Sequence, residues 1–511
     1  MKIERRKNAS RNIITGILLM LLRTLIPFVL RTAMIYKLGM EYVGLDSLFV
    51  SILHVLNLAE LGVGNAMVYS MYKPIAYDDS IKICALLNLY KKYYTLIGFI
   101  VLSAGLVIIP ILPNLISGSI PQDINLYILY IINLLATVMS YWLFAYKSSL
   151  LIAYQRNDVS NKIQIVVFTV RYIIQLIAII CFENFYIYTM AVLFTQMLTN
   201  VVTCIVTNKM YPDYKPVGEL SSKERKDVNR HIKDLFTAKL GSTVTNSADT
   251  IVISAFLGLT VLAKYNNYYY IMSALFGFMT IIFQSCLAGI GNSLVVETCE
   301  KNFEDFQKFS MLLTWIIGFF TVCLFCLFQP FIKIWVHEEN MLDNSFVVLF
   351  CLYFFVYELT LIWATYKDAG GIWHKDRFRP FCVTIVNLGL NLLTVRILGL
   401  YGIILSTVIS YIFVGMPWML YNIFTCLFHT RPWTYLRKLF WQIIVTVLAC
   451  FISGVICRYL TYEGILGVFL KGIVVTIVSN VIFCIFFCRM DGFEEVKNII
   501  IPFFKKYIRK D

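Results

Sequence analysis

Three arginines stand deep inside long apolar stretches of the chain, at Arg23, Arg31 and Arg171. At 100° per residue, Arg23 and Arg31 share one helical face. A charge near mid-bilayer costs about 2.5–3.5 kcal/mol on insertion scales, so deep arginines are expected to face a watery cavity. Because a guanidinium forks two hydrogen bonds toward a carboxylate or phosphate, we predict that these arginines form an anion site.

Acidic and amide side chains occupy other apolar stretches. Glu60 and Glu358 are two deep carboxylates, and one helical stripe carries Ser242, Asn246 and Asp249. Such residues are typical of cavity walls or of sites for a coupling ion, which leaves Na⁺ or H⁺ coupling open. The structural alternative is internal pairing, for example of Glu60 with Arg23 or Arg171.

The composition explains why these residues need a special environment. Hydrophobic residues make up 59% of the 511-residue chain, charged residues 14%, and the mean hydropathy is +0.74. A soluble chain is about 45–50% apolar and about 25% charged. The excess must face lipid, which excludes a soluble enzyme and a nucleic-acid-binding domain. The net charge of +14 then indicates topology rather than a nucleic-acid partner.

A membrane span needs about 20 mostly apolar residues, and the sequence predicts fourteen, all helical because open sheets leave unpaired edges in lipid. Lysines and arginines collect in every second loop, which predicts that both termini are cytoplasmic. The run at 12–36 is too long for a cleaved signal sequence and is expected to be retained. The predicted spans are 12–36, 42–72, 95–113, 124–146, 161–182, 185–208, 236–258, 261–296, 309–332, 345–366, 380–398, 400–427, 437–457 and 465–488.

Two motifs recur at similar spacing and predict a duplicated six-helix unit. Gly62–Ala66 (GVGNA) matches Gly289–Ser293 (GIGNS), and the Leu-Gly pair ending at Gly39 matches the pair ending at Gly258. Six spans is an even number, so both halves should have the same orientation in the membrane. We therefore expect an N-terminal lobe (1–208), a cytoplasmic linker (209–235), a C-terminal lobe (236–427), and two accessory helices with a basic tail (428–511).

The linker carries Ser221-x-x-Glu224, a capping-box pattern that predicts the start of a short amphipathic helix. The fourteen cysteines lie mostly in apolar runs and show no zinc spacing, so no metal and no cofactor are expected. The basic C-terminal tail is expected to lie on the inner leaflet.

Three blocks of the sequence resemble Wzx-type polysaccharide flippases of the multidrug/oligosaccharidyl-lipid/polysaccharide exporter superfamily. The blocks are LGMEYVGLDSLFVSILHVLNLAELGVGNAMVYSMYKPIAYDD, NSADTIVISAFLGLTVLAKYNNYYYI and GIGNSLVVETCEKNFEDF. The resemblance implies two six-helix lobes plus two accessory helices. It also implies export of an undecaprenyl-diphosphate-linked oligosaccharide across a bacterial cytoplasmic membrane, in contact with membrane lipids and with polysaccharide polymerase and chain-length machinery. In that family, first-span arginines hold the diphosphate, a role that carries over to Arg23 and Arg31.

Two other functions compete with the flippase. An exporter of small drug-like cations driven by Na⁺ or H⁺ would use a carboxylate-rich cavity, which three deep arginines disfavour. A membrane enzyme, such as a polymerase or a lipid-dependent glycosyltransferase, needs a sizeable outer loop with catalytic residues, whereas the outer loops here are short. We expect the charge of Asp249 to be neutralised in one of three ways: by a bound proton, by a bound cation, or by pairing with an arginine of the N-terminal lobe. The last of these would hold the two lobes together.

Overall fold

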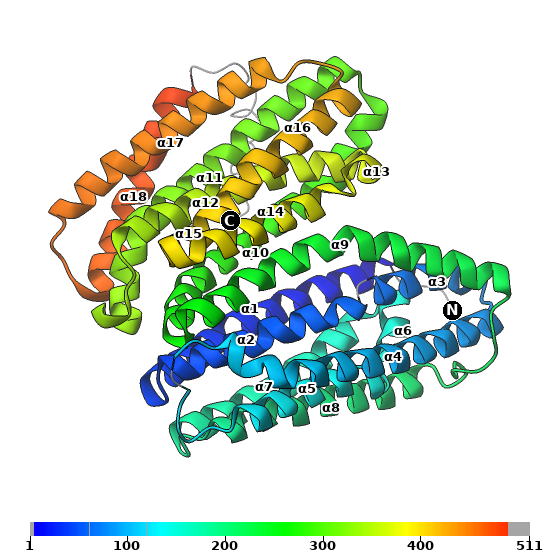
Figure 1. The fold of residues 1–511 in the computed structure, drawn as a ribbon. Helices are drawn as coiled ribbons and strands as arrows, with labels where there is room; N and C mark the ends of the chain where they lie inside the picture. The colour runs from blue at the N-terminus through cyan, green and yellow to red at the C-terminus, as the bar shows by residue number, and fades with distance from the viewer. Residues whose placement is uncertain (1–4, 61, 119, 489–511) are drawn as a thin grey trace, which may run out of the picture. The chain divides into compact units, whose positions relative to one another are not determined.

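The computed structural model describes residues 5–60, 62–118 and 120–488 and places them in helices joined by short turns (Figure 1). The chain forms two compact units, residues 1–263 and 264–511. Twelve helices in the described part are long and apolar enough to cross a membrane. The helix pair Leu126–Trp142 and Ala145–Ala153, bent by 49°, raises this number to thirteen when the pair is counted as one span. The protein is therefore a multi-pass, all-helical membrane protein.

In the first unit, α1 packs along α7, and α8 packs against both α7 and α5 (Figure 1). The N-terminal part of the chain thus forms its own helical bundle. Its helices are α1 (Arg5–Lys37), α2 (Met40–Leu56), α3 (Val63–Ala76), α4 (Ser80–Ile108), α5 (Leu126–Trp142), α6 (Ser148–Ala153), α7 (Asn157–Ile180), α8 (Phe185–Met210) and α9 (Ser222–Leu257), with short 3₁₀ turns at Asn57–Glu60, Ile109–Leu115 and Ala145–Lys147.

The predicted span 42–72 contains a 3₁₀ turn between two α-helices. Helix α2 ends at Leu56, a 3₁₀ turn covers Asn57–Glu60, and α3 begins at Val63. Gly62 caps α3 in the left-handed region, with φ of +88°, where a side chain would be strained. At this turn, Asn57 and Glu60 hydrogen-bond to tyrosines of other helices.

The two turn glycines of the predicted repeat share one backbone conformation. Gly39 precedes α2 with φ of 112° and ψ of 171°, and Gly258 precedes α10 with φ of 90° and ψ of 172°. The second motif differs, because Gly62 breaks a span whereas Gly289 lies inside the continuous helix α10 (Leu259–Val296). The halves therefore share a turn but not the break.

The capping box predicted at Ser221 is present. The Ser221 hydroxyl accepts from the Glu224 backbone N–H, and the Glu224 carboxylate accepts from the Ser221 N–H. The expectation of a short helix is wrong, because α9 continues for 36 residues through the predicted span 236–258. This helix packs against α2 and α3 of the first unit.

The segment between α8 and α9, residues 211–221, is the linker segment, and it lies on the first unit. Asn88 donates to the Gly218 carbonyl at 2.8 Å, and Lys147 donates to the Tyr214 carbonyl at 3.0 Å. Lys92 pairs with Glu219 at 2.8 Å. The linker segment is therefore held within the first unit by α4 and by Lys147.

In the second unit, α11 packs against α12, α17 and α18, and α12 packs against α15 and α16. Two segments within the span that starts at Leu400 have π-helical hydrogen bonding, a geometry frequent at functional sites. The remaining elements are α11 (Cys299–Val336), a 3₁₀ turn (Glu338–Asn340), α12 (Asn344–Ala369), α13 (Trp373–Asp376), α14 (Arg379–Leu398), α15 (Leu400–Ser410), the π segment Tyr411–Gly415, α16 (Met416–Ile423), the π segment Phe424–Phe428, α17 (Trp433–Tyr459) and α18 (Gly464–Phe487).

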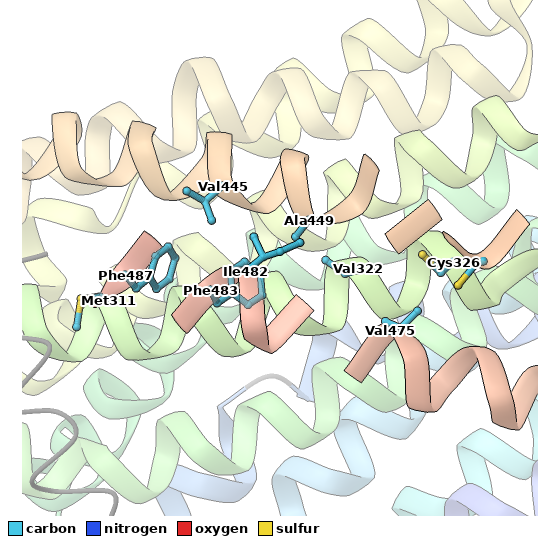
Figure 2. Packing of buried hydrophobic residues seen from close by; sticks show 10 residues of the cluster. Met311, Val322, Cys326, Val445, Ala449, Val475, Ile482, Phe483 and Phe487 are labelled. Carbon is cyan, nitrogen blue, oxygen red and sulfur yellow. The ribbon is translucent and has the colours of Figure 1, made fainter. Parts of the chain in front are cut away.

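The two helices expected as accessories, α17 and α18, pack on α11 (Figure 2). Apolar side chains from all three helices fill this contact, including Val322, Val445, Phe483 and Phe487. Each of these is at most 1% exposed. Small residues let the helices approach, since a Cβ on Gly318 would lie 2.9 Å from the Phe483 ring. The basic tail lies outside the described residues.

Candidate functional site

Two of the three predicted anion-site arginines meet on one aromatic ring. The Arg23 guanidinium on α1 lies 4.9 Å from the centroid of Phe168 on α7, and the Arg171 guanidinium lies 4.7 Å from the same centroid. Arg23 also donates to the Gln164 side-chain oxygen at 2.8 Å. A ring face attracts cations, so Phe168 holds two like charges close together without neutralising them.

Arg171 brings an unused donor to this group. Its Nε is buried and has no hydrogen-bond partner among the described residues. One terminal nitrogen lies 3.5 Å from the Tyr172 hydroxyl, at the limit of a hydrogen bond. A buried donor without an acceptor is costly, so an anionic ligand would gain by satisfying it.

Arg31 belongs to the same electrostatic neighbourhood. One of its nitrogens lies 3.4 Å from the Ala263 carbonyl. Asp46 on α2 interacts electrostatically with both Arg31 and Arg171. Tyr188 on α8 interacts with Asp46 and with the same two arginines. Arg23 in turn feels the charge of Arg171. The first unit therefore places the three arginines in one neighbourhood that also contains one carboxylate.

Sequence reasoning missed Asp46 and Phe168. Asp46 carries the same signal as the arginines, a charge inside an apolar run, and the criterion applied to them would have found it. Phe168 gives no such signal, because a phenylalanine in a membrane span is ordinary. Its ring contacts two guanidinium groups only because α1 and α7 pack side by side and bring Arg23 and Arg171 to it.

Glu60 lies in a different environment, at the break in the second span. It accepts a hydrogen bond from Tyr94, which in turn receives one from Tyr90 at 2.9 Å. Tyr141 donates to Asn57 in the same 3₁₀ turn at 2.8 Å. The alternative of Glu60 pairing with Arg23 or Arg171 is not what the structure shows, since the hydrogen-bond partners described for these residues are Tyr94, Gln164 and Tyr172.

The predicted polar stripe of α9 is described only in part. Asp249 is buried, at 7% exposed, in a helix that belongs to the first unit. The side chains of Ser242 and Asn246 lie outside the described residues. The stripe and the role of Asp249 therefore stay predictions.

Glu358 is the most deeply buried of the predicted carboxylates. It lies near the middle of α12 in the second unit and is 0% exposed. Neither of its carboxylate oxygens has a hydrogen-bond partner among the described residues. Glu358 thus belongs to the second unit, whereas the three arginines belong to the first.

The second unit also has a cavity that the sequence did not predict. Its volume is about 410 Å³, and its lining includes Gly289 and Ser293 of the repeated motif together with Asn302 and Lys308 of α11. Ser293 donates to Asn302 at 2.9 Å. Within the described residues, no group of three or more histidine, cysteine or acidic side chains could hold a metal ion.

The fold and these polar clusters define a class: a multi-pass membrane protein with charged and polar residues inside its apolar helices. No family model matches the sequence, and no curated protein matches it. Solved structures do match along most of its length.

One match is the lipid II flippase MurJ in its inward closed conformation, with a TM-score of 0.67 at 14% identity over 93% of this chain and 99% of that one. A second is the MATE transporter VcmN of Vibrio cholerae, with a TM-score of 0.55 at 12% identity over 83% of this chain and 99% of that one. A third is an outward-facing multidrug resistance MATE family transporter of the MOP superfamily, with a TM-score of 0.52 at 14% identity over 81% and 94% of the two chains. The chain has the fold that these transporters share.

Proposed function

We propose that the protein is a flippase that moves an undecaprenyl-diphosphate-linked oligosaccharide from the inner to the outer leaflet of a bacterial cytoplasmic membrane. Its product would be a repeat unit for cell-surface polysaccharide, and polymerase and chain-length machinery would act on that unit next. Transport by alternating access between the two units fits the fold of the matching transporters. In this proposal the chain moves its substrate and does no covalent chemistry.

The observation that carries the proposal is the pair of arginines on Phe168. A diphosphate linkage offers closely spaced anionic oxygens, and guanidinium groups bind such oxygens in pairs. Arg23 is solvent-accessible, and Arg171 keeps an unsatisfied buried donor. Both therefore have bonding capacity for a ligand, and their spans place that capacity at membrane depth.

The alternative is a Na⁺- or H⁺-coupled exporter of multidrug or small-cation substrates. The buried Glu358 favours it, and MATE transporters share the fold. Against it, three arginines that share one neighbourhood would repel a cation from the first unit. The two functions therefore predict opposite substrate charges at the same residues.

The test is transport by purified protein in liposomes. A fluorescent undecaprenyl-diphosphate oligosaccharide is placed in both leaflets, and its accessibility to an external quencher is followed. If the protein is a flippase, the labelled lipid should equilibrate between the leaflets faster than in empty liposomes. Arg23→Ala should abolish this acceleration. Lys471→Ala, which replaces a basic residue within α18, should retain it. Equal rates for protein-containing and empty liposomes, together with export of a lipophilic cation dye, would select the alternative.

A further inference from the structure

The second unit has a groove between α13 and α16 that the proposed function does not use. Its volume is about 690 Å³. Lys375 of α13 contributes to one wall, and the rest of the lining comes from α16 and the π segments on either side of it. We call it the α13–α16 groove, and its lining includes Lys375, Phe413, Val414, Trp418, Tyr421 and Thr425.

Specific contacts join the two sides of the α13–α16 groove. The Trp418 indole N–H donates to the Lys375 carbonyl at 3.3 Å, and the Lys375 ammonium donates to the Cys426 sulfur at 3.2 Å. Behind them, the Asn422 amide donates to Asp376 at 3.4 Å. The groove is therefore part of the packing of α13 on α16, and its other walls are π segments, a backbone geometry that is frequent at functional sites.

Positive charge is in excess at the α13 side of the groove. The segment 367–379 contains Lys367, Lys375, Arg377 and Arg379 but only two acids, Asp368 and Asp376. Both acids are already paired. Asp376 is bound by Arg379 at 2.8 Å, and Asp368 is bound by Lys367 at 2.8 Å. Lys375 and Arg377 are exposed, and neither forms an ion pair with another residue in the described part of the chain.

The groove lies at one boundary of the membrane. Two candidate membrane spans, Trp373–Leu398 and Leu400–Phe428, are joined at Gly399. Because the chain reverses there, the start of the first span and the end of the second lie on the same side of the bilayer. Lys375 and Thr425 lie at these two ends. The charged part of the groove is therefore expected where the bilayer meets water.

Aromatic side chains mark the same level. Trp373, Phe378 and Tyr421 are 63%, 53% and 70% exposed, and the Arg377 guanidinium lies 4.6 Å from the centroid of the Phe378 ring. Tryptophan and tyrosine collect at membrane–water interfaces, where their rings lie among lipid headgroups. A basic residue beside such a belt is placed to meet the phosphate of a lipid.

Away from Lys375 the groove becomes apolar. Phe413 and Val414 precede Thr425 by about twelve residues, which is about 18 Å along a helix. Phe413 is 72% exposed, and Pro417 and Trp418 lie between the two ends. The groove thus has a cationic end at the membrane boundary and an apolar end deeper in the span. A soluble anion would use only the first of these, whereas a lipid would use both.

We propose that the α13–α16 groove binds an acidic phospholipid of the surrounding membrane, with its phosphate at Lys375 and an acyl chain along Pro417 and Phe413. Lysine binds phosphate as a point charge, and basic pockets between membrane helices suit anionic headgroups. A zwitterionic lipid carries its own cation and gains less from Lys375. This proposal goes beyond the flippase function and does not depend on it.

The test is photo-crosslinking of the full-length protein in nanodiscs. Phosphatidylglycerol or phosphatidylcholine, each with a photoreactive acyl chain, is added at equal mole fraction, and labelled peptides are mapped by mass spectrometry. Residues 413–425 should be labelled more by phosphatidylglycerol. Lys375→Gln should reduce that labelling about fivefold, the equivalent of about 1 kcal/mol for one basic residue near an anionic surface. Lys375→Arg should retain it, because the charge remains.

Two further variants separate charge from packing. Lys301→Gln is the matched control, since Lys301 is another exposed lysine of the second unit but is already paired with Asp305 at 3.1 Å. It should label as wild type does. Phe413→Ala removes an exposed ring from the apolar end. It should reduce labelling by both lipids and leave the preference for phosphatidylglycerol unchanged.

Three results would overturn the proposal. The first is equal labelling of residues 413–425 by the two lipids, or full labelling by phosphatidylglycerol in Lys375→Gln. The second is loss of labelling when inorganic phosphate is added at constant ionic strength, which would assign the cationic end to a free anion. The third is absence of lipid labelling together with a cross-link from Lys375 to a second copy of the chain. Because lipid binding is read without transport, a protein that flips no oligosaccharide can still confirm the groove.

Discussion

Arg23 donates a hydrogen bond to the Gln164 side-chain oxygen at 2.8 Å, and this bond joins the guanidinium of α1 to α7. The amide oxygen accepts without removing the positive charge. Arg23 is thus positioned and still able to bind an anion, which distinguishes it from an arginine held by a carboxylate.

Replacement of Arg23 by alanine should reduce transport of the diphosphate-linked substrate roughly ten- to hundredfold, the equivalent of one lost charge-assisted hydrogen bond. Arg23→Lys should retain part of the rate, because a lysine keeps the charge but loses the fork. The measurement is the initial flipping rate in liposomes at equal protein content. A wild-type rate in Arg23→Ala would remove the residue from the site.

Phe168→Leu should weaken substrate binding about three- to tenfold, since the ring contributes a cation–π contact to each of two arginines. Phe168→Tyr keeps the ring and should bind nearly as wild type does. The readout is the substrate concentration giving half-maximal rate, with exposed Phe182→Leu as the control. Equal losses in the leucine and tyrosine variants would mean that the ring face is not what matters.

Gly44→Ala should destabilise the first unit by about 1–3 kcal/mol, a typical overpacking cost. A Cβ at Gly44 would collide with the Leu259 backbone carbonyl, which cannot move aside as a side chain can. Gly16→Ala is the matched control, because its Cβ would meet only Asn161 at 3.8 Å and a helical alanine is otherwise favoured over glycine. In detergent, the thermal unfolding temperature should therefore fall in Gly44→Ala and rise slightly in Gly16→Ala.

The docking of the linker segment should weaken in acid. Hydrogen bonds from Lys92 and Lys82 lower the pKa of Glu219 and Glu224. A carboxyl whose pKa is lowered on folding binds fewer protons in the folded state, so its stabilisation is full above the ordinary glutamate value of 4.5 and is lost as the pH falls below it.

Hydrogen exchange of residues 211–224, corrected for intrinsic rates, should therefore rise between pH 6 and pH 4 beyond what neighbouring helices show. The double variant Glu219→Gln, Glu224→Gln should exchange fast at both pH values, whereas Glu300→Gln in the first turn of α11 should match wild type. Both pairs are exposed, so the effect should be modest and should shrink at high salt. If the exchange rate of residues 211–224 in wild type did not change with pH, the predicted loss of docking in acid would be wrong.

Much of the fold was readable from the sequence, because hydropathy is what membrane insertion selects. Each predicted apolar run overlaps one or more described helices and, in several cases, the short turns between them. The count of fourteen and the orientation of the termini stay predictions. The capping box at Ser221 was predictable because it is local. The length of α9 was not predictable, because its polar first half suggests a surface helix and its apolar second half suggests a separate membrane span.

The break after Leu56 escaped prediction for a related reason. Hydropathy sees one long apolar run, whereas the 3₁₀ turn depends on Tyr94 and Tyr141 reaching Glu60 and Asn57 from other helices. In the same way, the sequence identified Arg23 and Arg171 but not the ring between them. A single charged residue inside an apolar run can be recognised from the sequence. Which charged residues lie close together depends on which helices pack against each other.

The docked linker segment bears on how the protein is made. Residues 1–263 form a compact unit, and residues 211–221 are held to that unit by Asn88, Lys92 and Lys147. Chains are synthesised from the N-terminus, and domains generally fold as units in that order. The first bundle, with this internal segment already in place, can therefore close while the spans of the second unit are still being synthesised. Arg23 and Arg171 would then meet on the Phe168 ring early, before the second unit has been inserted.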